Sequence, residues 1–220
     1  MGSEVYQLLK NDYDIICYDK GANLGKISVD LVVDFASAKS SVKMAEYCFE
    51  TKTALIVGST GQTEEEFKTI KKVSTVAPLM VCQNFSIGIV IVRNLIKEIL
   101  NQDIDDICIY EKHHKHKKDS PSGTAKTLLF DIQSYGKTAT VLSERGGEEI
   151  GKHKVDFYFG SELISVEHTA FSRKAFARGA VLAIEFMLNQ TNNQEYDFQQ
   201  ICQNFKFQNK KFDLKQQKMW

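Results

Sequence analysis

Residues 54–61 read ALIVGSTG, a continuous apolar run that ends in a Gly-Ser-Thr turn. An apolar run without polar alternation is typical of a strand that is buried on both faces of a parallel sheet. Three similar runs lie at Ile15–Tyr18, Leu31–Phe35 and Leu79–Cys82, with helical patterns between them at Ser40–Thr51 and Thr63–Val73. This alternation predicts an α/β fold with a Rossmann-like, doubly wound parallel sheet.

The second half of the chain has a different pattern. We predict an apolar helix at Gly88–Leu100, a strand at Ile107–Tyr110, a polar loop at Lys112–Ser122 and a helix at Thr124–Tyr135. Two alternating segments follow, Lys154–Phe159 and Leu163–His168, as expected of an antiparallel sheet with one face in water. We therefore expect a second, α+β domain with a mixed or antiparallel sheet, followed by a helix at Lys174–Leu188.

The start of the chain is unusual for a Rossmann-like fold. Met1–Leu9 is helix-like, with Val5, Leu8 and Leu9 on one side, and the first predicted strand comes only at Ile15. The 220 residues contain no G-x-G-x-x-G motif, which normally follows a central first strand and holds a pyrophosphate. We expect that the natural polypeptide includes this strand and glycine loop upstream of Met1.

Composition excludes several classes of protein. The 28 Lys and Arg balance 28 Asp and Glu, so no global field favours nucleic acid or a membrane surface. No apolar stretch approaches the ~18 residues of a membrane span, and Met1–Lys10 lacks the features of a secretory signal. The five cysteines are widely spaced and odd in number, which favours reduced thiols and a cytoplasmic location.

The densest chemical feature is residues 111–125, which read EKHHKHKKDSPSGTA. Lysines and histidines precede a Pro-Ser-Gly-Thr turn that opens a helix, so cationic side chains and free backbone N–H groups face one volume. The pattern is suited to holding an anion, and a histidine with a pKa of about 6.5 can deliver a proton near neutral pH.

Three other interpretations of this segment are open from the residues alone. It could be a solvated loop, which is the commonest role of a charged run. His113, His114 and His116 could bind zinc, although no other Cys/His cluster completes such a site. A nucleic-acid patch is disfavoured, because no aromatic residues alternate with the lysines.

The same segment carries the signature H-H-x-H-K-x-D-x-P-S-G-T-A and resembles that of dihydrodipicolinate reductases. Three further segments are similar to the family in the same order: residues 57–61, 84–88 and 168–180. The start Met1-Gly2-Ser3 matches the end of the family's first glycine loop. The resemblance implies reduction of 4-hydroxy-tetrahydrodipicolinate in lysine and diaminopimelate synthesis, with an inactive dicarboxylate-binding or scaffold protein as the alternative.

The resemblance also implies roles for individual residues. His113 is expected to be the acid/base residue and Lys117 the proton donor. His114, Gly123 and Thr124 are expected to hold the carboxylate of a dicarboxylate substrate. Arg173 is a further candidate for a substrate carboxylate, since Arg suits bidentate binding, or it could form an ion pair between domains.

On the cofactor side, Gly58, Ser59 and Thr60 follow a buried strand, where glycine lets a ligand approach the backbone. Family resemblance adds the segment after the next strand, which comprises Cys82, Gln83, Asn84 and Phe85. Asp19 ends the run Ile15–Tyr18, where an acid can bind a ribose, and Lys20 could tolerate a 2′-phosphate, so NADH or NADPH is expected. Asp19 and Lys20 could equally be a polar turn.

The resemblance finally implies an organisation for the whole chain. The nucleotide-binding domain is expected at residues 1–86 and 174–220, and the substrate-binding and oligomerisation domain at residues 87–173. A homotetramer is expected, with no metal, nucleic-acid or membrane partner. The polar tail Phe205–Trp220 is expected to be loosely held.

Overall fold

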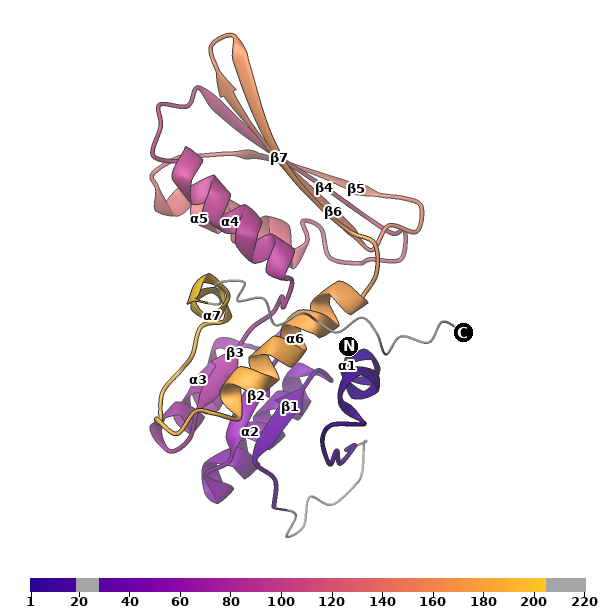
Figure 1. Ribbon diagram of the computed structural model, residues 1–220. Coiled ribbons are helices and arrows are strands. Elements are labelled where there is room, and N and C mark those ends of the chain that lie inside the picture. Colours follow the sequence, from indigo (N-terminus) through magenta and orange to yellow (C-terminus); the bar gives the residue numbers. More distant parts are fainter. Residues whose placement is uncertain (19–27, 205–220) are drawn as a thin grey trace.

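The computed structural model describes residues 1–18 and 28–204. In these residues the chain forms two sheets, each with its own helices (Figure 1). The first sheet is parallel and consists of β1 (Leu31–Asp34), β2 (Ala54–Val57) and β3 (Leu79–Val81), in that order. The second is mixed, in the order β5-β4-β6-β7. Both the α/β class and the mixed second sheet predicted from sequence are confirmed.

Helices cover both faces of the parallel sheet. The side chains of β2 point alternately to the two faces and enter two different cores. Leu55 and Val57 pack against helix α2 (Ala38–Thr51), helix α3 (Glu64–Lys71) and the 3-10 helix η1 (Lys72–Thr75). Ile56 packs on the opposite side against α1 (Gly2–Leu9) and α6 (Lys174–Met187). All four β2 residues are buried, so the continuous apolar run reports a doubly wound sheet.

Local sequence signals set the ends of these helices. The predicted capping box is present at the start of α3, where the Thr63 hydroxyl accepts from the Glu66 amide at 3.3 Å and the Glu66 carboxylate accepts from the Thr63 amide at 2.7 Å. The first helix faces the core through Val5 and Leu9, as predicted. The prediction for Leu8 is wrong, because this residue is 40% exposed and does not share the buried side of the helix.

The mixed sheet consists of β4 (Asp106–His113), β5 (Thr140–Arg145), β6 (Gly151–Phe159) and β7 (Glu162–Ala170). β4 is parallel to β5 and antiparallel to β6, and β6 is antiparallel to β7. Helices α4 (Ile87–Ile99) and α5 (Gly123–Ser134) share a core with β4 and β6 that includes Ile109 and Phe157. β5 was not predicted, because four of its six residues are exposed and its sequence TVLSER contains no long apolar run.

The predicted strand Ile15–Tyr18 is wrong, because these residues have no regular structure. Ile16 is 59% exposed and Tyr18 is 41% exposed, and Cys17 is exposed as well. No strand within the described residues pairs with this segment, and an apolar run without a hydrogen-bonding neighbour does not form a strand.

Close contacts with Phe85 and with strand β3 hold the end of the described chain against the parallel sheet. A Cβ atom at Gly179 of α6 would overlap the carbonyl oxygen of Phe85, so only glycine permits this crossing. Beyond α6, the Leu79 amide donates to the Gln194 carbonyl at 3.0 Å and the Tyr196 amide donates to the Leu79 carbonyl at 2.7 Å. The chain thereby covers the outer edge of β3 before α7 (Phe198–Asn204).

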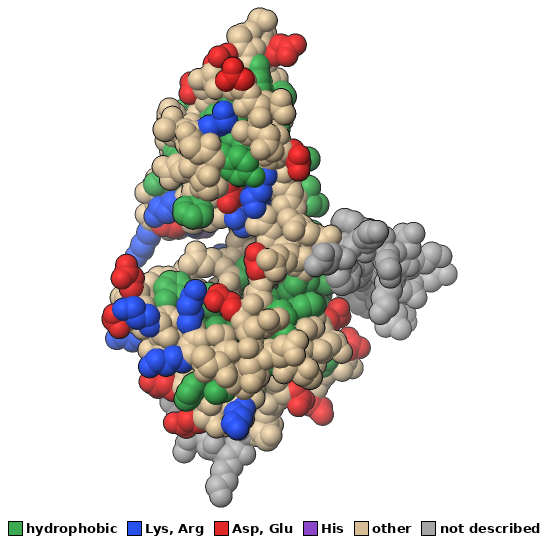
Figure 2. All heavy atoms as spheres, turned by 90° about the vertical axis from the view of Figure 1, so that its left-hand side faces the viewer, with side chains coloured by type: hydrophobic (Ala, Val, Ile, Leu, Met, Phe, Trp, Pro, Cys, Tyr) green, Lys and Arg blue, Asp and Glu red, His purple; other side chains and the backbone are tan. Residues whose placement is uncertain are grey.

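The described surface mixes both signs of charge. Figure 2 shows Lys and Arg side chains interspersed with Asp and Glu over both parts of the molecule on one face. Within residues 1–18 and 28–204, every helix is too short or too polar to cross a bilayer.

Candidate active site at the end of β4

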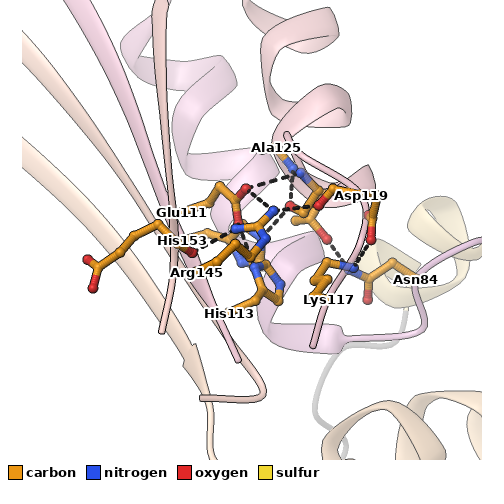
Figure 3. A network of polar contacts seen from close by, with 11 residues as sticks. Asn84, Glu111, His113, Lys117, Asp119, Ala125, Arg145 and His153 are labelled. Carbon is orange, nitrogen blue, oxygen red and sulfur yellow. Dashed lines mark hydrogen bonds and ion pairs between the residues drawn. The ribbon is translucent and has the colours of Figure 1, made fainter. Parts of the chain in front are cut away.

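The last residues of β4 place a carboxylate beside an imidazole. Glu111 and His113 are two residues apart in a strand and therefore project from the same face, and both are buried. Glu111 Oε2 lies 2.5 Å from His113 Nδ1. Arg145, which is opposite His113 on the neighbouring strand β5, holds the carboxylate with both terminal nitrogens at 2.6 and 2.9 Å (Figure 3).

Opposing effects set the charges of this pair. Burial raises the pKa of Glu111, but hydrogen bonds from Arg145, Ser143 and His113 lower that pKa to about 2. Burial lowers the pKa of His113, and Lys117 and Arg145 lower it further against the effect of Glu111. Near neutral pH the carboxylate is therefore ionised and the imidazole neutral. Since an ionised carboxylate only accepts, His113 carries its proton on Nδ1.

The turn before α5 leaves two backbone N–H groups free. Ser122 caps the helix by accepting from the Ala125 amide at 3.2 Å, and its own amide donates to Glu111 Oε1 at 3.2 Å. Its hydroxyl also lies 3.1 Å from His153 Nε2. The amides of Gly123 and Thr124 then have no partner among the described residues. Free amides at a helix start form a site for an anion.

The loop between β4 and α5 is fixed by several contacts. The Lys117 ammonium lies 2.8 Å from Asp119 Oδ1, while Arg145 donates to the Asp119 carbonyl at 2.6 Å. The His114 amide donates to the Glu149 carbonyl at 2.8 Å, and the His114 side chain is half-buried. In Figure 3, Lys117 and Asp119 lie at the side of the network nearer Asn84.

The segment after β3 meets the start of α5. The Asn84 side-chain amide donates to the Thr124 hydroxyl at 2.8 Å, and its oxygen accepts from the Ser86 amide at 2.9 Å. Gln83 is exposed. Burial raises the pKa of Cys82 to about 12, so its thiol stays protonated and donates to the Asn84 carbonyl at 3.2 Å. Asn84 therefore joins the predicted cofactor segment to the predicted substrate residues.

Of the other predicted cofactor residues, three pack inside the protein and one, Thr60, is exposed. A Cβ atom at Gly58 would overlap the ring of Phe35. Ser59 is buried, with its hydroxyl 2.5 Å from that of Ser41 and 2.7 Å from the Gln62 amide nitrogen. Phe85 is 2% exposed and packs edge-on against Phe35 and Phe198. Thr60 is exposed at the carboxyl edge of the sheet.

One described residue, Arg173, has no hydrogen bond or ion pair with this arrangement, and two further predicted residues are not placed relative to it. Arg173 is exposed at the start of α6 and has no ion pair with any residue that the structure describes. Asp19 and Lys20 lie outside the described residues.

A metal is a poor match for the same cluster. Glu111, His113 and His153 offer ligand atoms within 4.8 Å of one another, and burial and nearby His113 lower the pKa of His153 to about 3. However, the guanidinium of Arg145 already occupies both oxygens of Glu111 and would repel a cation. The arrangement suits an anion.

Sequence reasoning assigned no role to Glu111, Ser122, Arg145 or His153. A signal existed for Glu111, because a strand extended to His113 would have placed both side chains on one face. Arg145 and His153 reach the site only through strand pairing, on β5 and β6 respectively, and the local sequence carries no sign of that register.

Comparisons with known proteins cover almost the whole chain. Residues 1–85 match a family model described as dihydrodipicolinate reductase, N-terminus, and residues 88–202 match one described as dihydrodipicolinate reductase, C-terminus. The 4-hydroxy-tetrahydrodipicolinate reductase of Campylobacter jejuni is 33% identical over 211 residues, covering 82% of this chain and 86% of that protein. The enzyme of the same name from Clostridium perfringens is 34% identical over 216 residues, covering 89% and 84%.

A solved structure shares the fold. The dipicolinate-bound dihydrodipicolinate reductase from Paenisporosarcina sp. TG-14 has a TM-score of 0.70 and 18% identity, and the match covers 89% of this chain and 92% of that one.

Proposed function

The chain belongs to the dihydrodipicolinate reductase family, and we propose that it reduces 4-hydroxy-tetrahydrodipicolinate to tetrahydrodipicolinate with a hydride from NADH or NADPH and a proton, while the 4-hydroxyl group leaves as water. Membership of the family makes the chain an oxidoreductase. We place the reaction in lysine and diaminopimelate biosynthesis. The alternative of an inactive, dicarboxylate-binding protein has no support, since the similar proteins are named as reductases.

One observation of the structure carries this proposal. The free amides of Gly123 and Thr124 lie at the start of α5, where Asn84 from the predicted cofactor segment contacts Thr124 at 2.8 Å. An anionic substrate bound to these amides would lie next to that segment. Ser122, the residue before Gly123, donates from its amide to Glu111, which also contacts His113, so this substrate would lie beside the network of Figure 3.

We assign the proton chemistry to two side chains. Nε2 of neutral His113 has no hydrogen-bond partner among the described residues and is free to exchange a proton with the substrate. Lys117 carries a positive charge, is 24% exposed and can donate a proton once a substrate carboxylate competes for its contact with Asp119. Both groups act on the ring as it is reduced.

Substrate carboxylates are assigned to the amides at the start of α5 and to His114, and Arg173 at the start of α6 is kept as a separate candidate. Gly123 and Thr124 supply the two amides, and His114 is the first residue after His113 at the end of β4. Arg173 is free to form a bidentate contact, because its guanidinium has no ion pair within the described chain.

The exposed polar groups at the carboxyl edge of the parallel sheet are suited to binding a nicotinamide cofactor. Thr60 and Gln83 are exposed, Asn84 is half-buried, and no atom lies within 4 Å of a Cβ built at Gly61. Gly58, Ser59, Cys82 and Phe85 would form the floor beneath the cofactor, and we retain Asp19 and Lys20 for its ribose end. When bound, the reduced nicotinamide supplies the hydride.

A coupled assay tests this function. Purified protein is supplied with NADH or NADPH and freshly made product of the preceding synthase reaction, and loss of nicotinamide absorbance is followed. His113→Gln and Lys117→Met should each lower kcat about 10²- to 10⁴-fold. His116→Gln and Lys118→Met are the matched controls, since both residues are exposed on the same loop, and should change kcat less than about twofold. Absence of wild-type turnover with either nucleotide would reject the proposal.

We further propose the domain division 1–86 with 174–220, and 87–173. It is supported by the core that α6 shares with β2 and by the separate core of α4, α5, β4 and β6.

We propose a homotetramer, because Leu142, Leu163 and Ile164 on the outer strands are 44–52% exposed. Light scattering of the purified protein tests this. Five free cysteines favour a cytoplasmic location.

A further inference from the structure

The side chain of Glu111 is fully buried and satisfied from three directions. It accepts from His113 at 2.5 Å, from both terminal nitrogens of Arg145 at 2.6 and 2.9 Å, and from the Ser122 amide at 3.2 Å. Its exposed fraction is 0%. An ion pair that only stabilised the fold would not need the imidazole. The same carboxylate oxygen that holds Arg145 also holds His113.

The geometry fixes which imidazole nitrogen is available. Because Glu111 takes the proton-bearing Nδ1, Nε2 is the nitrogen with a lone pair. An ideal Cβ atom at Gly151 would come within 3.1 Å of Nε2, so a side chain at this position would crowd that nitrogen. Nε2 has no hydrogen-bond partner among the described residues.

The guanidinium of Arg145 links this pair to the loop that bears Lys117. Its Nη2 reaches both Glu111 and the Asp119 carbonyl, and the Asp119 carboxylate holds Lys117 at 2.8 Å. One arginine therefore sets the orientation of the carboxylate and the position of the loop.

We propose that Glu111 and Arg145 are positioning residues, which hold His113 in the Nδ1–H tautomer and leave the lone pair of Nε2 available for proton exchange; this rests on the proposed function. Neither residue touches the reacting atoms. Arg145 keeps Glu111 ionised and oriented, and Glu111 in turn orients the imidazole.

Histidine NMR on the wild-type protein is the first test and needs no substrate. With ¹⁵N-labelled histidine, assigned by comparison with His113→Gln, His113 should show a protonated Nδ1 and an unprotonated Nε2 at neutral pH. An Nε2–H tautomer at His113 in the folded wild-type protein would overturn the proposal, whatever any variant does.

Glu111→Gln is the second test. The new amide can still accept from Arg145 with its oxygen, but its NH₂ group faces Nδ1 and should drive His113 to the Nε2–H tautomer. We expect kcat to fall about 10²-fold or more with KM changed less than about threefold, because the substrate amides on α5 are untouched.

Glu144→Gln is the matched control. It makes the same substitution on the same sheet, next to Arg145, and breaks an exposed ion pair with Lys112. We expect an unchanged His113 tautomer and kcat within about twofold of wild type.

The outcomes separate the two proposals. A wild-type protein without turnover refutes the proposed function, and the positioning role falls with it. A wild-type protein with turnover, combined with a folded Glu111→Gln variant that keeps both its tautomer and its kcat, refutes the positioning role alone. If Glu111→Gln does not fold, the wild-type tautomer decides.

Discussion

The side-chain amide of Asn84 donates a hydrogen bond to the hydroxyl of Thr124 at 2.8 Å, although the two residues are 40 positions apart. Asn84 follows the last strand of the parallel sheet, and Thr124 lies in the first turn of α5 on the mixed sheet. This single bond joins the two predicted halves of the active site.

Asn84→Ala should therefore lower the free energy of unfolding by about 1–2 kcal/mol, because it removes two partly buried hydrogen bonds, to Thr124 and from Ser86. Urea denaturation measures this change. Asn101→Ala is the control, since the Asn101 side chain makes an exposed bond to the Lys97 carbonyl and no other hydrogen bond within the described residues, and should cost under about 0.5 kcal/mol. Equal stability losses in the two variants would contradict the structural role of Asn84.

Gly179→Ala should lower the free energy of unfolding by about 3 kcal/mol or more, because its Cβ would overlap the backbone oxygen of Phe85. Thermal unfolding provides the measurement. Gly2→Ala in α1 is the matched helical control, with open space around its Cβ, and should be neutral or stabilising by up to about 1 kcal/mol. A Gly179→Ala protein as stable as wild type would show that α6 does not cross Phe85 so closely.

The protein should lose stability as the pH falls from about 6.5 toward 3. Burial lowers the pKa of His153 to about 3, with a further contribution from His113, so the folded protein keeps this ring neutral while the unfolded chain protonates it. Its contribution is fully present above pH 6.5 and is lost as the pH approaches 3. Glu111 adds to this loss of stability below pH 4.5. Burial raises the pKa of its carboxyl, but the hydrogen bonds led by that from Arg145 have the larger effect and lower the pKa to about 2.

His153→Gln tests the histidine part of this effect. Between pH 6 and 4.5 its unfolding free energy should fall less steeply than that of wild type, by about 1.4 kcal/mol per pH unit for one proton. Exposed His116→Gln should keep the wild-type slope. Parallel slopes for wild type and His153→Gln would mean that His153 titrates normally in the folded protein.

Removal of metal ions with a chelator should change neither the stability nor the turnover of the protein. Arg145 occupies the carboxylate that a metal would need, so the protein purified without added metal should carry no stoichiometric zinc by elemental analysis. Prolonged dialysis against EDTA should preserve the rate of turnover. Activity that is lost to EDTA and restored by zinc would instead assign Glu111, His113 and His153 to a metal site.

The sequence predicted those parts of the fold in which the order of apolar and polar residues follows directly from burial or from a local contact. Ala54–Val57 is apolar throughout because both faces of β2 are covered, and the capping box at Thr63 is a purely local signal. β5 escaped prediction because its side chains lie mostly in solvent. Ile15–Tyr18 has the composition of a strand, but a strand also needs a neighbour, which composition does not reveal.

The site divides in the same way. The turn at Ser122 and Gly123 could be recognised as an anion-binding helix start, and the structure leaves its two amides free. Arg145 and His153 are 34 and 42 residues from Glu111, and only the register of the mixed sheet places them beside it. Long-range strand pairing follows from the packing of the whole domain.

The return of the chain along β3 also bears on how the protein behaves at high concentration. An uncovered strand at the rim of a sheet can recruit the same strand from another molecule and begin aggregation. Here the amide and carbonyl of Leu79 are already engaged by Gln194 and Tyr196. The segment after α6 thus covers an edge at which self-association could begin. A shortened variant that ends at Asn189, which also loses the core residues Phe198 and Ile201, should give a more turbid solution than the full chain at equal concentration.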